Sequence, residues 1–324
     1  MVQISQPNED FLNRDFVIPT VFEIMNPYLV FMDILPRVKT NSQVVRYKQE
    51  TVSQSTDPKK ETPRVRTASS KFAYVDITNF EQKSAILDSQ GFAIRIDESA
   101  IQFEEGIDEI NRAYKAIGYW LGESVNTLIA TTLKANATTP TWAPYKVWSD
   151  AACTPTADLV TLAGQMRREG YPYRLTDVYV NSTNYWEMIS RLTAQLTNTD
   201  IAFREITGVP SATGEERMSV PVIGGDVHGL LSGIDEGYIL GLDRNNPAGT
   251  LFYNNNPKYA PQQITYSVID PANPGSRIQK TIDNFGFSFN SYVEPESHDT
   301  VMQFWIDTVP VVKEPYAALY DSGI

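Results

Sequence analysis

One amphipathic pattern constrains this chain more than any other feature of the sequence. Between residues 104 and 135 apolar side chains recur every three or four positions, which is the spacing of one helical face. These side chains are Ile107, Ile110, Tyr114, Ile117, Leu121, Val125, Leu128 and Ile129. At 1.5 Å per residue, the pattern predicts one helix about 48 Å long. Acidic residues in its first turns suit the positive end of the helix dipole.

The other predicted elements mix helices and strands without regular βαβ alternation, which favours an α+β fold over a doubly wound one. Alternation of Phe92, Ile94 and Ile96 predicts a strand just before the long helix. Two further helices are expected over residues 156–169 and 182–192. Further strands are expected over residues 177–180, 220–223, 238–242, 264–269, 277–294 and 301–306.

The N-terminal third predicts an arm followed by a long hairpin. Four prolines interrupt residues 1–36, so we expect an extended arm with at most a short helix around residues 21–25. Residues 42–53 and 63–78 suit two strands, and the polar segment between them predicts a hairpin tip near residues 57–61. An isolated two-stranded hairpin is marginal in water, so this one must pack on something or be disordered.

Charge reverses sign along this part of the chain. Residues 37–71 hold nine basic and three acidic side chains, a net +6, whereas the whole chain carries −12. Residues 97–109 hold six acids and no base, a net −6. The basic stretch can be a solvated loop, a nucleic-acid contact, or a loop that docks on another copy. Tyr47 favours the nucleic-acid reading and the acidic total opposes it.

The acidic stretch also has a plain interpretation, compensation of the helix dipole. Because the two stretches match in size and differ in sign, we favour self-assembly, with the arm of one copy lying on the ridge of the next. The predicted basic contacts are Arg46, Lys48, Lys59, Lys60, Arg64 and Arg66. The predicted acidic contacts are Glu98, Glu104, Glu105, Asp108 and Glu109.

Motifs for catalysis and cofactors do not emerge from the sequence. His228 and His298 are 70 residues apart and no cysteine accompanies them at ligand spacing, so no metal and no cofactor is expected. The lone Cys153 excludes a disulfide within the chain. No apolar run approaches the roughly 18 residues that span a bilayer, so we expect no membrane partner and a soluble, cytoplasmic protein. Carboxylate pairs cannot be read from spacing, so an acidic α+β hydrolase stays open as an alternative.

The order of elements, together with several local phrases, is similar to a known family. The phrases are DVYVNSTNYWEMIS (177–190), VPVIGGDV (220–227), GYILGLDRNNP (237–247) and FSFNSYVEPESHDTVMQFW (287–305). This combination resembles the major capsid protein of tailed bacteriophages and related archaeal viruses. The resemblance implies the HK-ninety-seven-type capsid fold, which herpesvirus capsid floors and encapsulins also use.

The resemblance implies a division of the chain into parts. Residues 1–36 would be the N-terminal arm and 37–78 the extended loop. Residues 79–151 and 276–300 would form the peripheral domain, with its spine helix near 104–135. Residues 152–275 and 301–324 would form the compact axial domain.

The resemblance also implies a structural function and no enzyme activity. Copies would form hexamers and pentamers and then an icosahedral virion capsid enclosing double-stranded DNA, without tight sequence-specific binding. Assembly would occur in the host cytoplasm. Because the arm starts close to Met1, we expect separate scaffolding and portal proteins. Some relatives crosslink a lysine of this loop, and Lys59 and Lys60 lie at its tip, but nothing in the sequence supports the rest of that reaction. An encapsulin-type compartment is the main alternative.

Overall fold

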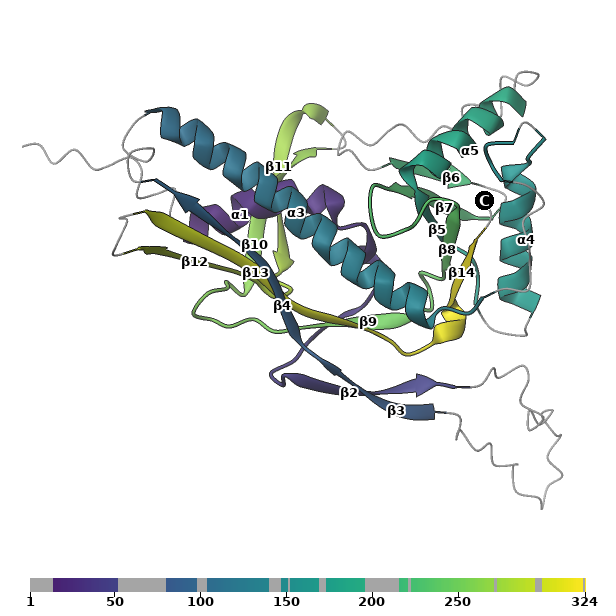
Figure 1. The fold of residues 1–324 in the computed structure, drawn as a ribbon, viewed down its shortest axis with the longest axis horizontal. Coiled ribbons are helices and arrows are strands. Elements are labelled where there is room, and N and C mark those ends of the chain that lie inside the picture. Colours follow the sequence, from purple (N-terminus) through teal and green to yellow (C-terminus); the bar gives the residue numbers. More distant parts are fainter. Residues whose placement is uncertain are drawn as a thin grey trace, which may run out of the picture.

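The structure is a computed structural model, shown in Figure 1. It describes residues 14–51, 80–97, 104–139, 147–150, 152–168, 173–195, 216–220, 223–270, 273–294, 299–322 and 324. Within these residues the chain forms two five-stranded sheets and two separate two-stranded hairpins. The first sheet lies beneath one long helix, and the second lies beside two shorter helices on the right of the view (Figure 1).

A long strand near the C-terminus organises the first sheet. This strand, β13 (Thr300–Val312), pairs antiparallel with three others, and the short strand β1 pairs parallel with one of them. The neighbours are β4 (Asp88–Ile96), β9 (Gly249–Tyr253), β12 (Phe287–Val293) and β1 (Arg37–Lys39). On one face of β13 the side chains of Met302, Phe304 and Ile306 are at most 1% exposed. Alternation along β13 therefore sends one row of side chains into the core.

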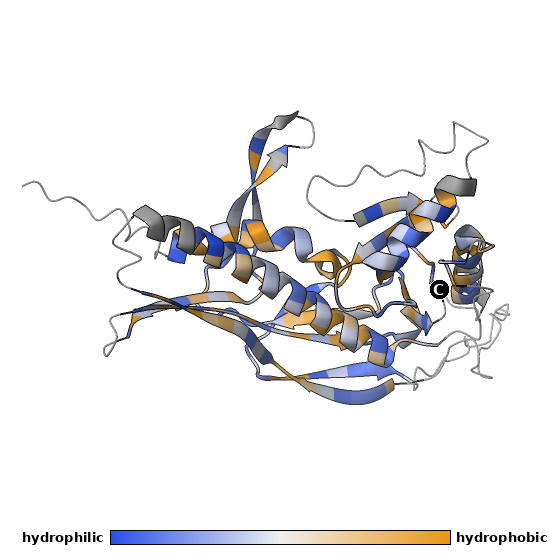
Figure 2. Ribbon diagram, turned by 45° about the horizontal axis from the view of Figure 1, so that its top comes forward, coloured by the Kyte–Doolittle hydropathy of each residue, from blue (hydrophilic) through white to orange (hydrophobic). Residues whose placement is uncertain are grey.

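The long helix α3 (Glu104–Asn136) covers this sheet and confirms the predicted helix over residues 104–135. From Ile110 to Ile129 its inward stripe is buried except for the half-buried Leu128, and the ring of Tyr114 lies 6.3 Å from that of Phe304 on β13. Figure 2 shows the resulting alternation of hydrophobic and hydrophilic residues along α3. The apolar spacing read from the sequence is therefore the face that packs on the sheet.

The N-terminal segment differs from the expected extended arm. Helix α1 (Arg14–Met25) is followed by two 3₁₀ turns, η2 (Asn26–Tyr28) and η3 (Val30–Asp33). Pro19 lies inside α1, where it removes one backbone hydrogen bond. The helix persists because one face is fully buried, with Val17, Ile18, Val21, Phe22 and Met25 all at 0% exposure. Tertiary burial thus outweighs the proline. The helix expected around residues 21–25 is present, but it begins at Arg14, so the expectation of an extended arm is wrong for residues 14–20 and 26–33.

Two glycines bring α1 against α3. A Cβ added at Gly118 would lie 2.7 Å from Cγ2 of Ile24, and one added at Gly122 would lie 2.8 Å from Cβ of Tyr28. Both distances are below any normal contact between carbon atoms. Residues 118 and 122 are four apart and share one face of α3, so this face admits the N-terminal segment only without side chains.

Each hairpin lies outside the two main sheets. Strand β2 (Val44–Glu50) pairs with β3 (Phe80–Ile86), from Val44 opposite Ile86 to Glu50 opposite Phe80. The expected partner of this strand, residues 63–78, is therefore wrong, because β2 pairs with residues 80–86. Residues 63–78 and the expected tip, 57–61, lie outside the described residues. The second hairpin, β10 (Gln263–Asp270) with β11 (Asn273–Asp283), rises from the body beside α1 (Figures 1 and 2).

The second sheet has the strand order β14-β8-β5-β7-β6. Its central strand β5 is apolar and buried on both faces, with Val178, Tyr179 and Val180 at 0% exposure. The other strands are β14 (Ala318–Ser322), β8 (Tyr238–Leu242), β5 (Asp177–Asn181), β7 (Gly225–Leu230) and β6 (Glu216–Val220). Helices α4 (Pro155–Arg168) and α5 (Ser182–Gln195) lie beside it, and the turn η4 (Pro315–Ala317) leads into β14.

Several expected strands are confirmed and one is wrong. Strands β5, β8 and β10 match the predictions over 177–180, 238–242 and 264–269. The strand expected over 220–223 instead ends at Val220, because Gly224 turns the chain with φ of +66°.

Strand pairing also bears on the expected division of the chain near residue 300. Strand β13 (Thr300–Val312) belongs to the same sheet as β4 and β12, whereas only β14 joins the second sheet. Residues 300–312 therefore share a sheet with β4 and β12. No described helix is both long and apolar enough to cross a membrane.

Candidate assembly surfaces

The β2–β3 hairpin turns one face to solvent, and that face is basic and apolar. Arg46 and Lys48 are exposed on β2, opposite Ser84 and Gln82 of β3. At the next pair along, Val44 and Ile86 are 46% and 59% exposed. Since paired residues share a face of a sheet, these side chains form one continuous surface, which we call the hairpin outer face.

The opposite face of the hairpin holds it to the body. Val45 and Gln49 are buried. The Gln49 side-chain amide donates to Val312 O at 3.0 Å and to Oδ1 of Asn136, at the end of α3, at 3.1 Å. The hairpin is therefore anchored where α3 ends and β13 finishes.

This anchoring decides where the predicted charges can meet. Gln49 contacts the last residue of α3, whereas Glu104 is its first residue. At 1.5 Å per residue the two ends of this helix are about 50 Å apart. Arg46 and Lys48, next to Gln49 on β2, therefore cannot reach the acidic start of α3 in the same chain. A contact between these charges requires two copies.

The remaining predicted contact residues are placed only in part. Glu104, Glu105, Asp108 and Glu109 lie in the first turns of α3, where the structure gives the backbone. The others fall outside the described residues, and they are Lys59, Lys60, Arg64, Arg66 and Glu98. The contact between the basic and acidic stretches stays a prediction.

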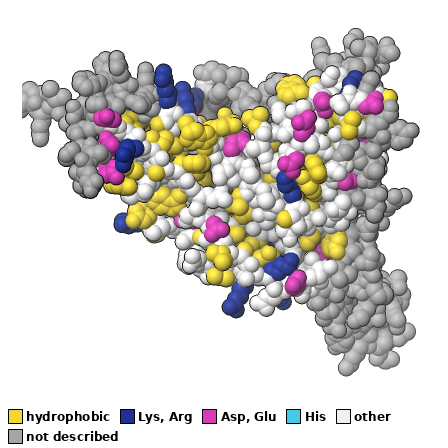
Figure 3. Space-filling model, in the orientation of Figure 1, with side chains coloured by type: hydrophobic (Ala, Val, Ile, Leu, Met, Phe, Trp, Pro, Cys, Tyr) yellow, Lys and Arg dark blue, Asp and Glu magenta, His cyan; other side chains and the backbone are white. Residues whose placement is uncertain are grey.

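A second surface was not predicted from the sequence. On the outer side of α3, Tyr119 and Trp120 are 36% and 47% exposed, and the Trp120 ring lies 5.7 Å from that of Phe92 on β4. These rings border a groove of about 720 Å³ that also touches Glu123. Figure 3 shows hydrophobic side chains gathered over α3 on this face. The sequence did not predict this surface, because helical spacing identifies the buried stripe of a helix but not which outward residues remain exposed to solvent.

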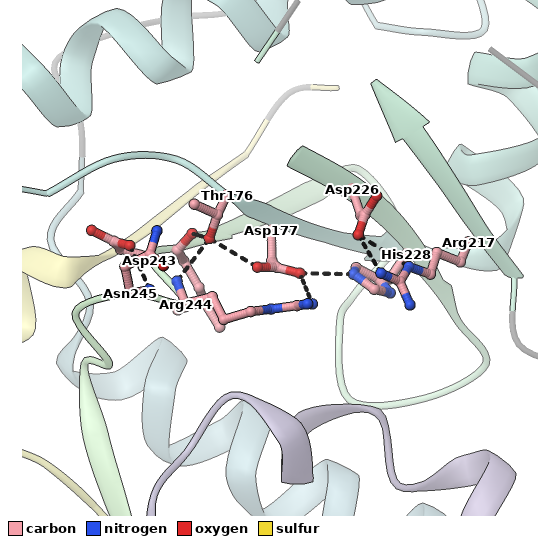
Figure 4. A network of polar contacts seen from close by, with 9 residues as sticks. Thr176, Asp177, Arg217, Asp226, His228, Asp243, Arg244 and Asn245 are labelled. Carbon is pink, nitrogen blue, oxygen red and sulfur yellow. Dashed lines mark hydrogen bonds and ion pairs between the residues drawn. The ribbon is translucent and has the colours of Figure 1, made fainter. Parts of the chain in front are cut away.

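A buried polar network lies in the second sheet, where sequence spacing gave no signal. Strand β5 places Asp177 beside β7, and its Oδ1 lies 3.0 Å from Nε2 of His228 and 2.5 Å from Nη2 of Arg244 (Figure 4). The hydroxyl of Thr176 donates to its Oδ2 at 2.9 Å. Burial alone would raise the pKa of Asp177, but these hydrogen bonds and the Arg244 charge outweigh it and hold the pKa below its usual value.

The same network brings together three groups that could ligate a metal. Oxygen atoms of Asp177 and Asp226 and a ring nitrogen of His228 lie within 4.8 Å of one another. Arg217 pairs with Asp226 at 2.5 Å, as Arg244 does with Asp177. Two guanidinium charges therefore balance the two carboxylates, and the cluster works as a structural ion-pair network. His298 lies outside the described residues.

Comparison with known proteins identifies the family. A family model described as phage capsid protein matches residues 81–320. The chain belongs to the phage capsid protein family. It is thus a structural shell protein of a virion capsid and not an enzyme, which removes the acidic hydrolase alternative. No curated protein sequence matches it.

Solved structures of shells share the fold of this phage capsid protein. A virus-like particle from Pyrococcus furiosus aligns with a TM-score of 0.53 at 12% identity, covering 94% of this chain and 97% of that one. An encapsulin complex from Synechococcus elongatus aligns with a TM-score of 0.52 at 12% identity, covering 93% and 88%. The fold is the α+β capsid fold of the HK-ninety-seven type.

Proposed function

We propose that this chain is a major capsid protein whose copies form hexamers and pentamers and close into an icosahedral shell around double-stranded DNA. Membership of the phage capsid family supports the shell. We further propose that assembly takes place in the host cytoplasm with separate scaffolding and portal proteins. The net charge of −12 suits a shell that encloses DNA without binding it tightly.

The single observation that carries this proposal is the hairpin outer face. It belongs to a hairpin that is anchored through Gln49 at the last residue of α3, about 50 Å along this helix from its acidic start. A surface that meets a different surface on the next copy builds closed rings. We therefore propose that the hairpin of one copy, including Lys59, Lys60, Arg64 and Arg66, docks near Glu98 and the first turns of α3 in its neighbour.

Charge alone supplies a modest part of the binding energy. Exposed ion pairs contribute about 0.2–1 kcal/mol each, and salt weakens them. The exposed apolar pair Val44 and Ile86 on the same face offers further area to bury. The proposed contact is thus apolar with electrostatic steering, and low salt should favour it.

The proposed division of the chain follows the two sheets. Residues 37–78 are the extended loop, which begins with β1 in the first sheet and is joined to the hairpin strand β3. The first sheet with α3 forms the peripheral domain, and the second sheet with α4 and α5 forms the axial domain.

A charge reversal tests the docking proposal. We expect Arg46→Glu with Lys48→Glu, or Arg64→Glu with Arg66→Glu, to block shell formation and leave a folded subunit. Reversing Glu104 and Glu105 to lysine in the same chain should partly restore shells. Sedimentation and negative-stain microscopy at low salt provide the readout. The matched control is Arg167→Glu with Lys280→Glu, two exposed bases on α4 and β11 that lie outside both proposed surfaces, and it should form shells normally. Normal shells from both hairpin variants would contradict the docking proposal.

An encapsulin-type compartment is the second candidate function. The alignment with the Synechococcus elongatus encapsulin complex favours it as far as fold goes. The contents of shells purified from the native host separate the two candidates. Double-stranded DNA inside them would support the virion capsid, and a cargo protein without DNA would support the compartment.

A further inference from the structure

The place where the β2–β3 hairpin joins the body contains a buried acidic residue. Glu50 is the last residue of β2 and is 5% exposed. Its backbone N–H donates to the carbonyl of Lys313 at 2.8 Å, just beyond the end of β13. Together with the two hydrogen bonds of Gln49, this bond fixes the hairpin base. Any change at Glu50 therefore acts on the attachment of the whole hairpin.

Two carboxylates lie near one phenol at this position. The hydroxyl of Tyr173 donates to Oε2 of Glu314 at 3.0 Å, and both Tyr173 and Glu314 influence the pKa of Glu50. A phenol carries a single proton, so it can serve only one of the two carboxylates at a time. Oε2 of Glu50 is buried and has no hydrogen-bond partner among the described residues. A buried carboxylate oxygen in this state is costly, and one added proton would relieve it.

The charged and titratable groups around Glu50 come from β2, from the chain after β13 and from Tyr173. Lys48 lies two residues before Glu50 on the same side of β2, where its side chain is exposed to solvent. Glu314, after β13, brings a second negative charge, and Tyr173 is neutral. The ammonium group of Lys313 lies over the ring of Phe252, 5.3 Å from its centroid. The other described groups at the hairpin base are uncharged. Helix α3 contributes the side-chain amide of Asn136, and β3 contributes Phe80, which pairs with Glu50.

A proton suits this position better than a metal ion. Oε2 of Glu50 has no contact with solvent. A divalent cation such as Mg²⁺ keeps several water ligands, whereas this oxygen is shielded from water. A proton needs no room and allows Glu50 to donate a hydrogen bond.

We propose that Glu50 and Glu314 form a proton-operated latch that holds the β2–β3 hairpin on the body at acidic pH and loosens it as the pH rises. Burial and the neighbouring charge of Glu314 raise the pKa of Glu50, and they outweigh the influence of Tyr173, which lowers it. Glu50 therefore holds its proton more tightly when the hairpin is attached to its own body than when the hairpin is detached. Attachment of the hairpin to its own body is fully favoured below the usual glutamate pKa of 4.5. It weakens as the pH rises from there to the raised pKa of Glu50.

The latch has a consequence for shells that rests on the proposed function. A hairpin freed from its own body at neutral pH can turn to a neighbouring copy, whereas a hairpin latched by acid is held in one orientation. Protonation would thus set which hairpin orientation enters the shell.

Hydrogen exchange followed by mass spectrometry tests the latch directly on free subunits of the full chain. Exchange in residues 44–50 is measured between pH 4.5 and pH 8 and corrected for intrinsic rates. In the native sequence we expect the corrected exchange to rise with pH, by up to about tenfold per pH unit, until Glu50 is fully ionised. Residues 287–293 of β12, within the first sheet, serve as the internal reference.

Three variants sharpen the test. Glu50→Gln keeps the shape and removes the charge, so its hairpin should stay protected across the whole range. Glu314→Gln removes the neighbouring negative charge and should reduce the pH dependence of exchange in residues 44–50. Glu81→Gln is the matched control, because Glu81 is exposed on β3, and it should behave as the native sequence does.

Several results would overturn the latch. Corrected exchange that does not change with pH in the native sequence would do so, as would a Glu50→Gln hairpin that is more open than the native one. Protection restored at pH 8 by 10 mM Ca²⁺ in the native sequence but not in Glu50→Gln would replace the proton by a cation. Because free subunits are used, a failure of shell formation leaves this test unaffected and is scored separately.

Discussion

Adding one methyl group to Gly118 should weaken this protein, although the same addition at Gly164 should strengthen it. Both glycines lie inside helices, Gly118 in α3 and Gly164 in α4. Replacing a helical glycine by alanine normally stabilises by about 1 kcal/mol, because alanine loses less backbone entropy on folding. The two positions differ in what the new Cβ meets.

Around Gly164 there is nothing within 4 Å of an added Cβ. At Gly118 the Cβ would lie 2.7 Å and 2.9 Å from two side-chain atoms of Ile24 and 3.1 Å from the carbonyl oxygen of Val21. Helix α1 would have to move away from α3, and overpacking of this kind costs about 1–3 kcal/mol. Since the helix-propensity gain is common to both variants, Gly118→Ala should be about 1–3 kcal/mol less stable than Gly164→Ala.

Urea denaturation followed by circular dichroism measures this difference, with all variants in the same assembly state. Ile24→Ala removes the nearest contact. Gly118→Ala should therefore cost less stability when it is introduced into the Ile24→Ala protein than when it is introduced into the native sequence. Equal stabilisation by Gly118→Ala and Gly164→Ala would refute the reasoning, since it would mean that α1 does not need the bare face of α3.

Two further predictions concern buried ionisable groups. Asp177→Asn leaves Arg244 and His228 without their carboxylate and should cost about 3 kcal/mol in urea denaturation, while a loss below 0.5 kcal/mol would contradict the network. Because the pKa of Asp177 is lowered in the folded state, its contribution should be present above pH 3.8 and vanish as the pH falls through the lowered pKa. Burial and the charge of Asp158 raise the pKa of Cys153 to about 11, so about one thiol in a thousand is ionised at pH 8 and alkylation should be slow until the chain unfolds. Labelling of the native protein within minutes, seen by mass spectrometry, would contradict this.

The sequence predicted those elements whose local pattern and tertiary role agree. Helix α3 was predicted almost to its ends because its apolar stripe is long and faces one partner. Strand β5 was predicted because it is short, apolar and buried on both faces. Strands β7 and β9 escaped prediction because both begin with glycine, and β7 carries a second glycine, Gly229, together with Asp226 and His228 in place of a clear alternation.

For the assembly surfaces, the sequence showed which residues are charged, and the structure showed where the described ones lie. Nine basic and six acidic residues in two stretches suggested that copies bind one another. Only the anchoring of Gln49 at Asn136 showed that the described basic residues cannot meet the start of α3 within one chain. The uncovered rings of Tyr119 and Trp120 gave no sequence signal, because an exposed aromatic residue on a helix has no spacing of its own.

The sequence by itself determined the long spine helix, the α+β class and the charge reversal, because each follows from the order of residue types along the chain. Tertiary structure alone decided that residues 14–25 form a helix despite Pro19, that Gly118 and Gly122 admit it, and that the charge of Glu314 acts on Glu50. These features depend on groups up to 264 positions apart in the chain, as Glu50 and Glu314 are. Local periodicity carries no information about such distant neighbours, and burial against them supplies most of the stabilising free energy.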